Sequence, residues 1–278
     1  MKQFHIISVG NSLLTNFKRT KKDIENLSYD KDKEWRELFD DPIFRDEIYN
    51  FVKEKPKKHS AELNSFLRFV EKYHVENKDV LIYLFGTNTG SNEICKNTIK
   101  RYLNEQGYRL ANPKEFAGYF WENSNYDNRY AEKEFIEGIG ELVDRVIYLA
   151  KKKQEEGFDV YVNPTGGFKA HVVASALAGT LTGSKVYYIH ETFTDIILFP
   201  PLFYVPKGKE IEVLEILSDK EPRSGHDYET LAGQFTDEID RLETYELVSV
   251  KRDDYEKTFR IQITERGLLY YNFVKKDR

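Results

Sequence analysis

The 278-residue chain is long enough for one large domain or two small ones, each with its own core. With 40% hydrophobic and 32% charged residues it has the composition of a globular protein, and its net charge of −5 excludes the overall positive field of many nucleic-acid-binding proteins. The single cysteine, Cys95, excludes an intramolecular disulfide and a cysteine-based zinc cluster.

No stretch reaches the ~20 consecutive apolar residues of a membrane span, and the first residues lack the apolar core of a signal peptide. We therefore expect a cytoplasmic protein without a membrane partner.

Three apolar, β-rich runs predict buried strands, and each ends in turn-forming residues. Phe4 to Val9 ends in Gly10, Asn11 and Ser12, whereas residues 79–87 end in Gly86-Thr87 and residues 159–162 lead into Asn163-Pro164-Thr165-Gly166-Gly167-Phe168-Lys169. Helical spacing predicts helices over residues 61–73, 92–106, 131–154 and 170–181, and the charged segment 18–60 predicts surface helices and loops.

A fourth strand over 185–191 and a broken strand over 195–206 complete the pattern. Strands alternating with helices predict an α/β fold, a Rossmann-like and mostly parallel sheet with helices on both faces. Ligands of such sheets bind beyond the carboxyl ends of the strands, where the three polar turns would converge.

The residues after Pro206 have a different character. Residues 207–225 suggest a connector with one or two helical turns, and a helix over 228–247, a charged hairpin and a terminal amphipathic helix follow. This order predicts a small winged-helix domain, and we place the domains at 1–207 and 208–278.

The turn from Asn163 to Lys169 has the properties of an anion site. A helix N-terminus exposes free N–H groups, glycines allow close approach to them, and a lysine adds a full charge. The pattern is neither the P-loop nor G-x-G-x-x-G, and a glycine pair at a strand-helix turn is equally compatible with a merely tight connection.

The motif "NPTGGFKA", together with "SVGNSLLTN" near the N-terminus and "AELNSF" at 61–66, resembles the CRISPR-associated Rossmann-fold (CARF) proteins, more narrowly those followed by a winged helix. Several of these are ring nucleases that degrade cyclic tetra-adenylate. The resemblance implies a sensor domain over residues 1 to about 205, a homodimer with the ligand on its two-fold axis, and a reaction without metal or other cofactor.

The resemblance also implies residue roles. Lys169 would contact the scissile phosphate, and Ser12 would position the ligand near the attacking 2′-hydroxyl. Ligand-binding residues would be Gly10, Asn11, Thr87, Asn88, Thr165, Gly166, Gly167 and Phe168, although the family more often has Asp where this chain has Asn88. The 2′-oxygen would attack the neighbouring phosphate, and the protein would orient it and stabilise the developing charge.

Simpler explanations exist for each residue. Ser12 could cap a helix beginning at Leu13, and Lys169 could be a solvated first-turn side chain. His171, two positions after Lys169, should point away from the site, and we expect Tyr187 and Tyr188 in the core. The runner-up function is a non-catalytic, ligand-gated transcription regulator, and a ligand-stimulated ribonuclease is third. The acidic helix over 228–247 argues against insertion into DNA.

Overall fold

The computed structural model describes residues 2–111, 128–167, 169–190, 192–199, 204, 206–253 and 258–276. The chain forms two compact units, Met1–Phe199 (unit 1) and Pro200–Arg278 (unit 2). From the sequence we predicted the domain boundary between residues 207 and 208. No helix of the described part is both long and apolar enough to cross a membrane.

Unit 1 is built on a six-stranded sheet with the order β3-β2-β1-β4-β5-β6. The strands are β1 (Gln3–Ser8), β2 (Val80–Phe85), β3 (Arg109–Leu110), β4 (Asp159–Asn163), β5 (Lys185–Tyr188) and β6 (Ile197–Leu198). All neighbouring pairs are parallel except β5 and β6, which are antiparallel. The predicted Rossmann-like, mostly parallel α/β sheet is confirmed, and its order reverses between β1 and β4.

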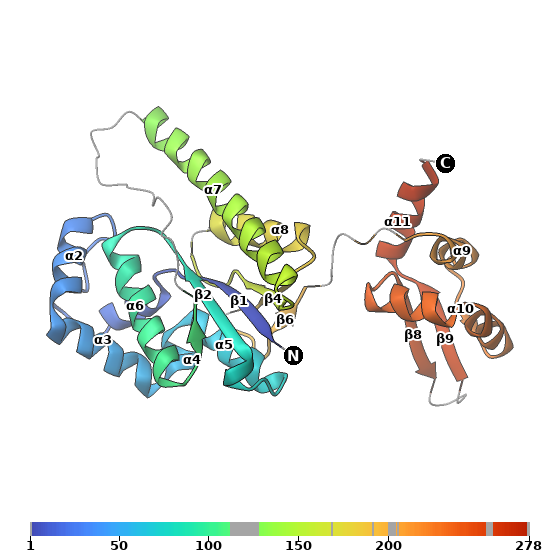
Figure 1. Cartoon of the computed structure of the whole chain (residues 1–278), viewed down its shortest axis with the longest axis horizontal. Coiled ribbons are helices and arrows are strands. Elements are labelled where there is room, and N and C mark those ends of the chain that lie inside the picture. Colours follow the sequence, from blue (N-terminus) through green and yellow to red (C-terminus); the bar gives the residue numbers. More distant parts are fainter. Residues whose placement is uncertain are drawn as a thin grey trace. The chain divides into compact units, whose positions relative to one another are not determined.

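Helices cover both faces of the sheet (Figure 1). The first core joins one face of the sheet to α1 (Ser12–Lys18), α2 (Asp32–Asp40), α3 (Pro42–Glu54), α5 (Ala61–Lys72) and α6 (Gly90–Glu105), and the second joins the other face to α7 (Asn128–Glu155) and α8 (Lys169–Leu181). The short helix α4 (Pro56–His59) buries no residue and contacts α1, α3 and α5. Successive strand residues point to opposite faces, so Ile7 belongs to the first core and Ile6 to the second. A 3₁₀ turn, η1 (Asn77–Asp79), leads into β2.

The charged segment 18–60 does not lie only on the surface. Trp35 of α2 and both Ile48 and Val52 of α3 are fully buried in the first core. These apolar residues are sparse in a charged sequence, but they recur at helical spacing and give each helix one buried stripe.

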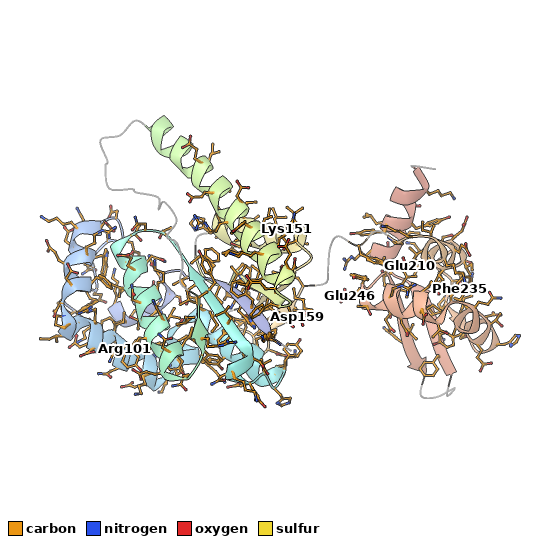
Figure 2. The ribbon with its side chains drawn as sticks, in the orientation of Figure 1. Arg101, Lys151, Asp159, Glu210, Phe235 and Glu246 are labelled. Atoms are coloured by element: carbon orange, nitrogen blue, oxygen red, sulfur yellow. The ribbon has the colours of Figure 1, made fainter. Side chains whose placement is uncertain are left out.

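Unit 2 contains α9 (Lys209–Ile216), β7 (Arg223–Ser224), α10 (His226–Thr244), β8 (Val248–Asp253), β9 (Thr258–Ile263) and α11 (Glu265–Lys276). Its three strands form an antiparallel sheet in the order β7-β9-β8, so the predicted hairpin is present. Phe235 has non-helical φ/ψ and divides α10 into two helices (Figure 2). The predicted connector is a core element, because Val213, Leu214 and Leu217 are buried.

Candidate functional site

Three strand ends come together at the point where the strand order reverses. In the register of the sheet, Ser8 lies beside Phe85 and Ile7 beside Asn163. The residues that follow β1, β2 and β4 therefore emerge at one edge, as predicted from the chain order. They contribute to a pocket of about 290 Å³ lined by Val9, Gly10, Asn11, Ser12, Thr15, Tyr29, Thr87, Asn92, Gly167 and His171.

The pocket contains some of the predicted site residues and not others. Its lining includes Gly10, Asn11, Ser12, Thr87 and Gly167. Four others, Asn88, Thr165, Gly166 and Lys169, do not belong to the lining. Phe168 lies outside the described residues.

Ser12 does not cap its own helix. Helix α1 begins at Ser12 itself, and its N-cap residue is Asn11, whose side chain makes no cap hydrogen bond. The Ser12 hydroxyl instead donates to Glu62 Oε2 at 2.8 Å and accepts the Ala61 N–H at 3.0 Å. The expectation of a simple helix cap is wrong, and Ser12 links the end of β1 to the start of α5.

Glu62 is a site residue that the sequence reasoning missed. Its side chain is buried, and its carboxylate accepts hydrogen bonds from Gly10 N at 2.8 Å, Ser12 Oγ at 2.8 Å and Ser60 Oγ at 2.7 Å. It occupies the first turn of α5, where a negative charge is favoured by the helix dipole. Its signals were a Ser-Ala-Glu helix start, which many surface helices share, and its place in the "AELNSF" stretch of the family resemblance, to which we had assigned no role.

The glycines of the motif are required by close packing. A Cβ atom on Gly166 would lie 2.2 Å from Glu62 Oε1 and 2.7 Å from the Ser8 carbonyl oxygen. A Cβ atom on Gly10 would lie 2.3 Å from the Gly167 nitrogen, and Gly167 itself has a φ of +105°, which favours glycine. The turn therefore packs directly on the end of β1 and on the Glu62 carboxylate.

Thr165 serves the turn rather than the pocket. Its hydroxyl donates to Asn163 Oδ1 at 2.6 Å, and its backbone N–H donates to the same oxygen at 3.2 Å. The Asn163 amide donates in turn to Ser65 Oγ on α5 at 2.7 Å. These bonds fix the shape of the strand-helix connection.

Of Lys169 and His171, we expected Lys169 at the site and His171 away from it, and the structure shows the reverse for the pocket. Lys169, the first residue of α8, is exposed, whereas His171 is buried and lines the pocket. Burial lowers the pKa of His171, so the neutral imidazole is favoured near pH 7. The expectation that His171 points away from the site is wrong, because residues two apart on a helix face different directions and the helix turns His171 inward.

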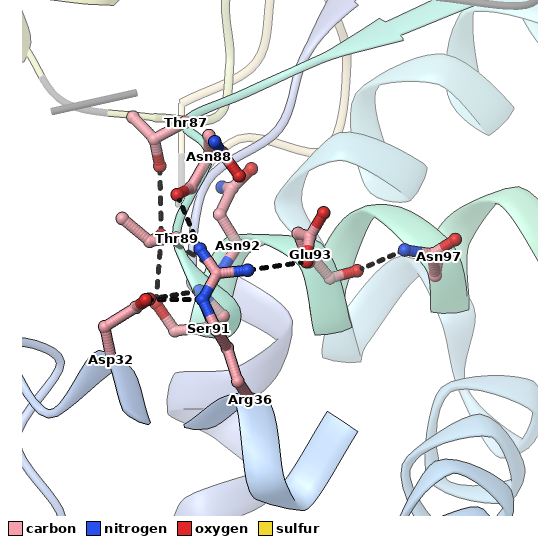
Figure 3. A network of polar contacts seen from close by, with 10 residues as sticks. Asp32, Arg36, Thr87, Asn88, Thr89, Ser91, Asn92, Glu93 and Asn97 are labelled. Carbon is pink, nitrogen blue, oxygen red and sulfur yellow. Dashed lines mark hydrogen bonds and ion pairs between the residues drawn. The ribbon is translucent and has the colours of Figure 1, made fainter. Parts of the chain in front are cut away.

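Two side chains of α2, Asp32 and Arg36, form a clamp that holds the loop after β2 (Figure 3). Arg36 donates to the Asn88 carbonyl oxygen at 3.0 Å and pairs with Asp32 at 2.6 Å and Glu93 at 3.3 Å. The buried Asp32 carboxylate also accepts the Gly90 N–H. Asn88 is thus held through its backbone carbonyl, and the sequence reasoning missed the clamp because it treated residues 18–60 as surface.

Among the described residues, metal-ligating side chains do not gather at this edge. Within the described ranges, no group of three or more His, Cys, Asp or Glu side chains could hold a metal ion. Metal independence remains a prediction.

The protein has an α/β fold, and its pocket lies where the strand order of a Rossmann-like sheet reverses, which is the usual place of a ligand site in such folds. Residues 57–202, more than half of the chain, match the model of a family described as CRISPR-associated protein (Cas_APE2256). The chain belongs to this family.

Two solved structures are similar over nearly the whole chain at low identity. Protein VC1899 from Vibrio cholerae is 10% identical with a TM-score of 0.34, over 97% of this chain and 64% of that one. Can2 from Sulfobacillus thermosulfidooxidans, solved in complex with cyclic tetra-adenylate, is 11% identical with a TM-score of 0.28, over 98% of this chain and 63% of that one. The chain thus spans somewhat less than two thirds of either protein.

Proposed function

We propose that the protein is a CARF-type ring nuclease that binds cyclic tetra-adenylate and cleaves it by attack of a ribose 2′-hydroxyl on the adjacent phosphate, ending CRISPR signalling by that ligand. The observation that carries the proposal is the convergence of Asn11, Ser12 and Gly167 at one pocket in a chain of a CRISPR-associated family. Residue roles follow the sequence resemblance, with Lys169 stabilising charge on the phosphate.

The size of the pocket supports a two-fold assembly. At about 290 Å³ it lies just below the ~300–1,000 Å³ range of small-molecule sites, so a ring of four nucleotides must extend beyond it. A homodimer would offer two identical pockets to the ring.

An exposed apolar stripe on α8 suggests where the second copy would pack. Val173, Leu177 and Leu181 are each more than half exposed and follow Lys169 at intervals of four residues. A second copy on this face would bring two Lys169 side chains toward the shared ligand.

The test is incubation of the protein with excess cyclic tetra-adenylate and a chelator, followed by mass spectrometry. We expect multiple turnovers to linear products with cyclic-phosphate ends, and a loss of at least ~100-fold in rate for Lys169→Ala. The matched control is Lys151→Ala, which removes another exposed helix lysine (Figure 2). Recovery of intact ring from a tight complex with the wild-type protein would refute the nuclease proposal.

The alternative is a ligand-sensing transcription regulator that binds DNA through unit 2. The second half of α10 would be the DNA-reading helix of a winged-helix domain, and its exposed residues include Asp237, Asp240 and Glu243. Arg241 on the same helix is paired with Glu210 and Glu238. This surface would repel DNA phosphates, so DNA binding is disfavoured.

A further inference from the structure

The hydrogen-bond capacity of Ser12 restricts what its hydroxyl can do for a ligand. A serine hydroxyl has one proton to donate and two lone pairs. The proton is directed to Glu62 Oε2 at 2.8 Å, and one lone pair accepts the Ala61 N–H at 3.0 Å. A ligand in the pocket therefore meets an accepting lone pair of Ser12, which suits a hydroxyl that must give up its proton.

The structure assigns to Glu62 the role of proton acceptor behind Ser12, an inference that rests on the proposed function. As the 2′-oxygen attacks phosphorus, its proton passes to Ser12 Oγ while the Ser12 proton passes to Glu62 Oε2. The bond between phosphorus and the 5′-oxygen breaks, and the departing 5′-oxygen takes a proton from solvent water. Glu62 then returns its proton to solvent through Ser12, and atoms and charge balance without a metal or cofactor.

Glu62 is placed to act only through Ser12. Its side chain is buried, and Gly166 packs so closely on Oε1 that a single added carbon would lie 2.2 Å away. The other oxygen, Oε2, lies within hydrogen-bond distance of Ser12, which lines the pocket, and of Ser60, which is buried. Glu62 is therefore a positioning residue and proton acceptor, and Ser12 is the group that contacts the ligand.

A purely architectural role for Glu62 makes different predictions. The carboxylate also joins the end of β1 to the start of α5 through Gly10 N and Ser60 Oγ, and a loss of that junction would disturb the pocket as a whole. It would weaken ligand binding and add to the effect of losing Ser12. A proton acceptor instead changes the chemical step and has no further effect once Ser12 is absent.

The experiment compares Glu62→Gln, Ser12→Ala and the double variant in single-turnover cleavage at saturating cyclic tetra-adenylate, with the dissociation constant measured separately. General-base assistance is worth ~10²–10⁴-fold, so we expect Glu62→Gln to slow cleavage at least ~100-fold. The dissociation constant should change less than about threefold, and the double variant should match Ser12→Ala. Glu62→Asp, which keeps a carboxylate, should recover part of the rate and serves if the amide variant fails to fold.

The matched control is Glu210→Gln in unit 2. Glu210 is also a buried carboxylate with three hydrogen-bond donors, namely Tyr204 Oη, Lys207 N and Arg241 Nε, and its loss should leave cleavage unchanged. If the wild-type protein cleaves the ring and Glu62→Gln cleaves it equally fast, or loses only affinity, the role of Glu62 is overturned. The proposed function would then still stand. A wild-type protein that binds the ring without cutting it overturns the proposed function and this inference with it.

Discussion

His5 makes the stability of unit 1 dependent on pH. The side chain is fully buried in β1, bonded to Tyr187 Oη at 3.1 Å and stacked on Tyr161 at 4.9 Å, and burial lowers its pKa from 6.5 to about 3. Below pH 6.5 the unfolded chain binds a proton at His5 that the folded chain does not bind until about pH 3. Stability is therefore lost as the pH falls through this window, by about 1.4 kcal/mol per pH unit once well below pH 6.5.

Between pH 6 and pH 4 this single group should remove about 2 to 3 kcal/mol from the free energy of unfolding. Urea titrations followed by tryptophan fluorescence would measure it, because Trp35 is fully buried in unit 1 and the sequence of unit 2 contains no tryptophan. His5→Phe keeps a ring on Tyr161 but cannot titrate, and other groups largely cancel in the difference between the two proteins. Equal pH slopes for wild type and His5→Phe would show that this reasoning is incorrect.

Two further predictions concern packing and access. Gly166→Ala places a methyl group against Glu62 Oε1 and should destabilise unit 1 by about 1–3 kcal/mol, whereas Gly140→Ala on α7, where a Cβ meets nothing within 4 Å, should be neutral or stabilise by up to about 1 kcal/mol. Denaturant titration of both variants checks this, and equal stabilities would contradict it. Burial raises the pKa of the Cys95 thiol, so a thiol reagent should label the protein only in denaturant; rapid labelling of the native protein would contradict the buried position.

The sequence was sufficient to predict the central strands of the sheet and the edge where the pocket lies, but not the two-residue strand β3. Buried parallel strands appear as continuous apolar runs, and β1, β2 and β4 begin and end within two residues of the predicted bounds. The polar turns after these strands converge because parallel strands end at one edge. Tyr187 is in the core, as expected, whereas Tyr188 is only partly buried.

The partners of the pocket residues could not be predicted in the same way. Glu62 reaches Gly10 and Ser12 across about 50 positions of the sequence, so the contact depends on how α5 packs against the end of β1. The Asp32–Arg36 clamp likewise depends on the position of α2. Local sequence carries no information on such contacts, whereas the periodicity of apolar residues that marks a strand or a helix is a local pattern.

The positions of Ser12 and Lys169 constrain how one ligand could use both. Ser12 lines the pocket, whereas Lys169 is exposed and lies outside it. A ligand confined to the pocket would not explain a catalytic lysine, but a ring that extends over the start of α8 could meet both groups. Separate measurements of ligand binding and of the cleavage rate therefore distinguish two roles for Lys169. If Lys169→Ala slows the chemical step without weakening binding, the lysine acts on the phosphate. If the variant loses affinity for the ring while the rate of the chemical step stays constant, the lysine serves only to bind the ring.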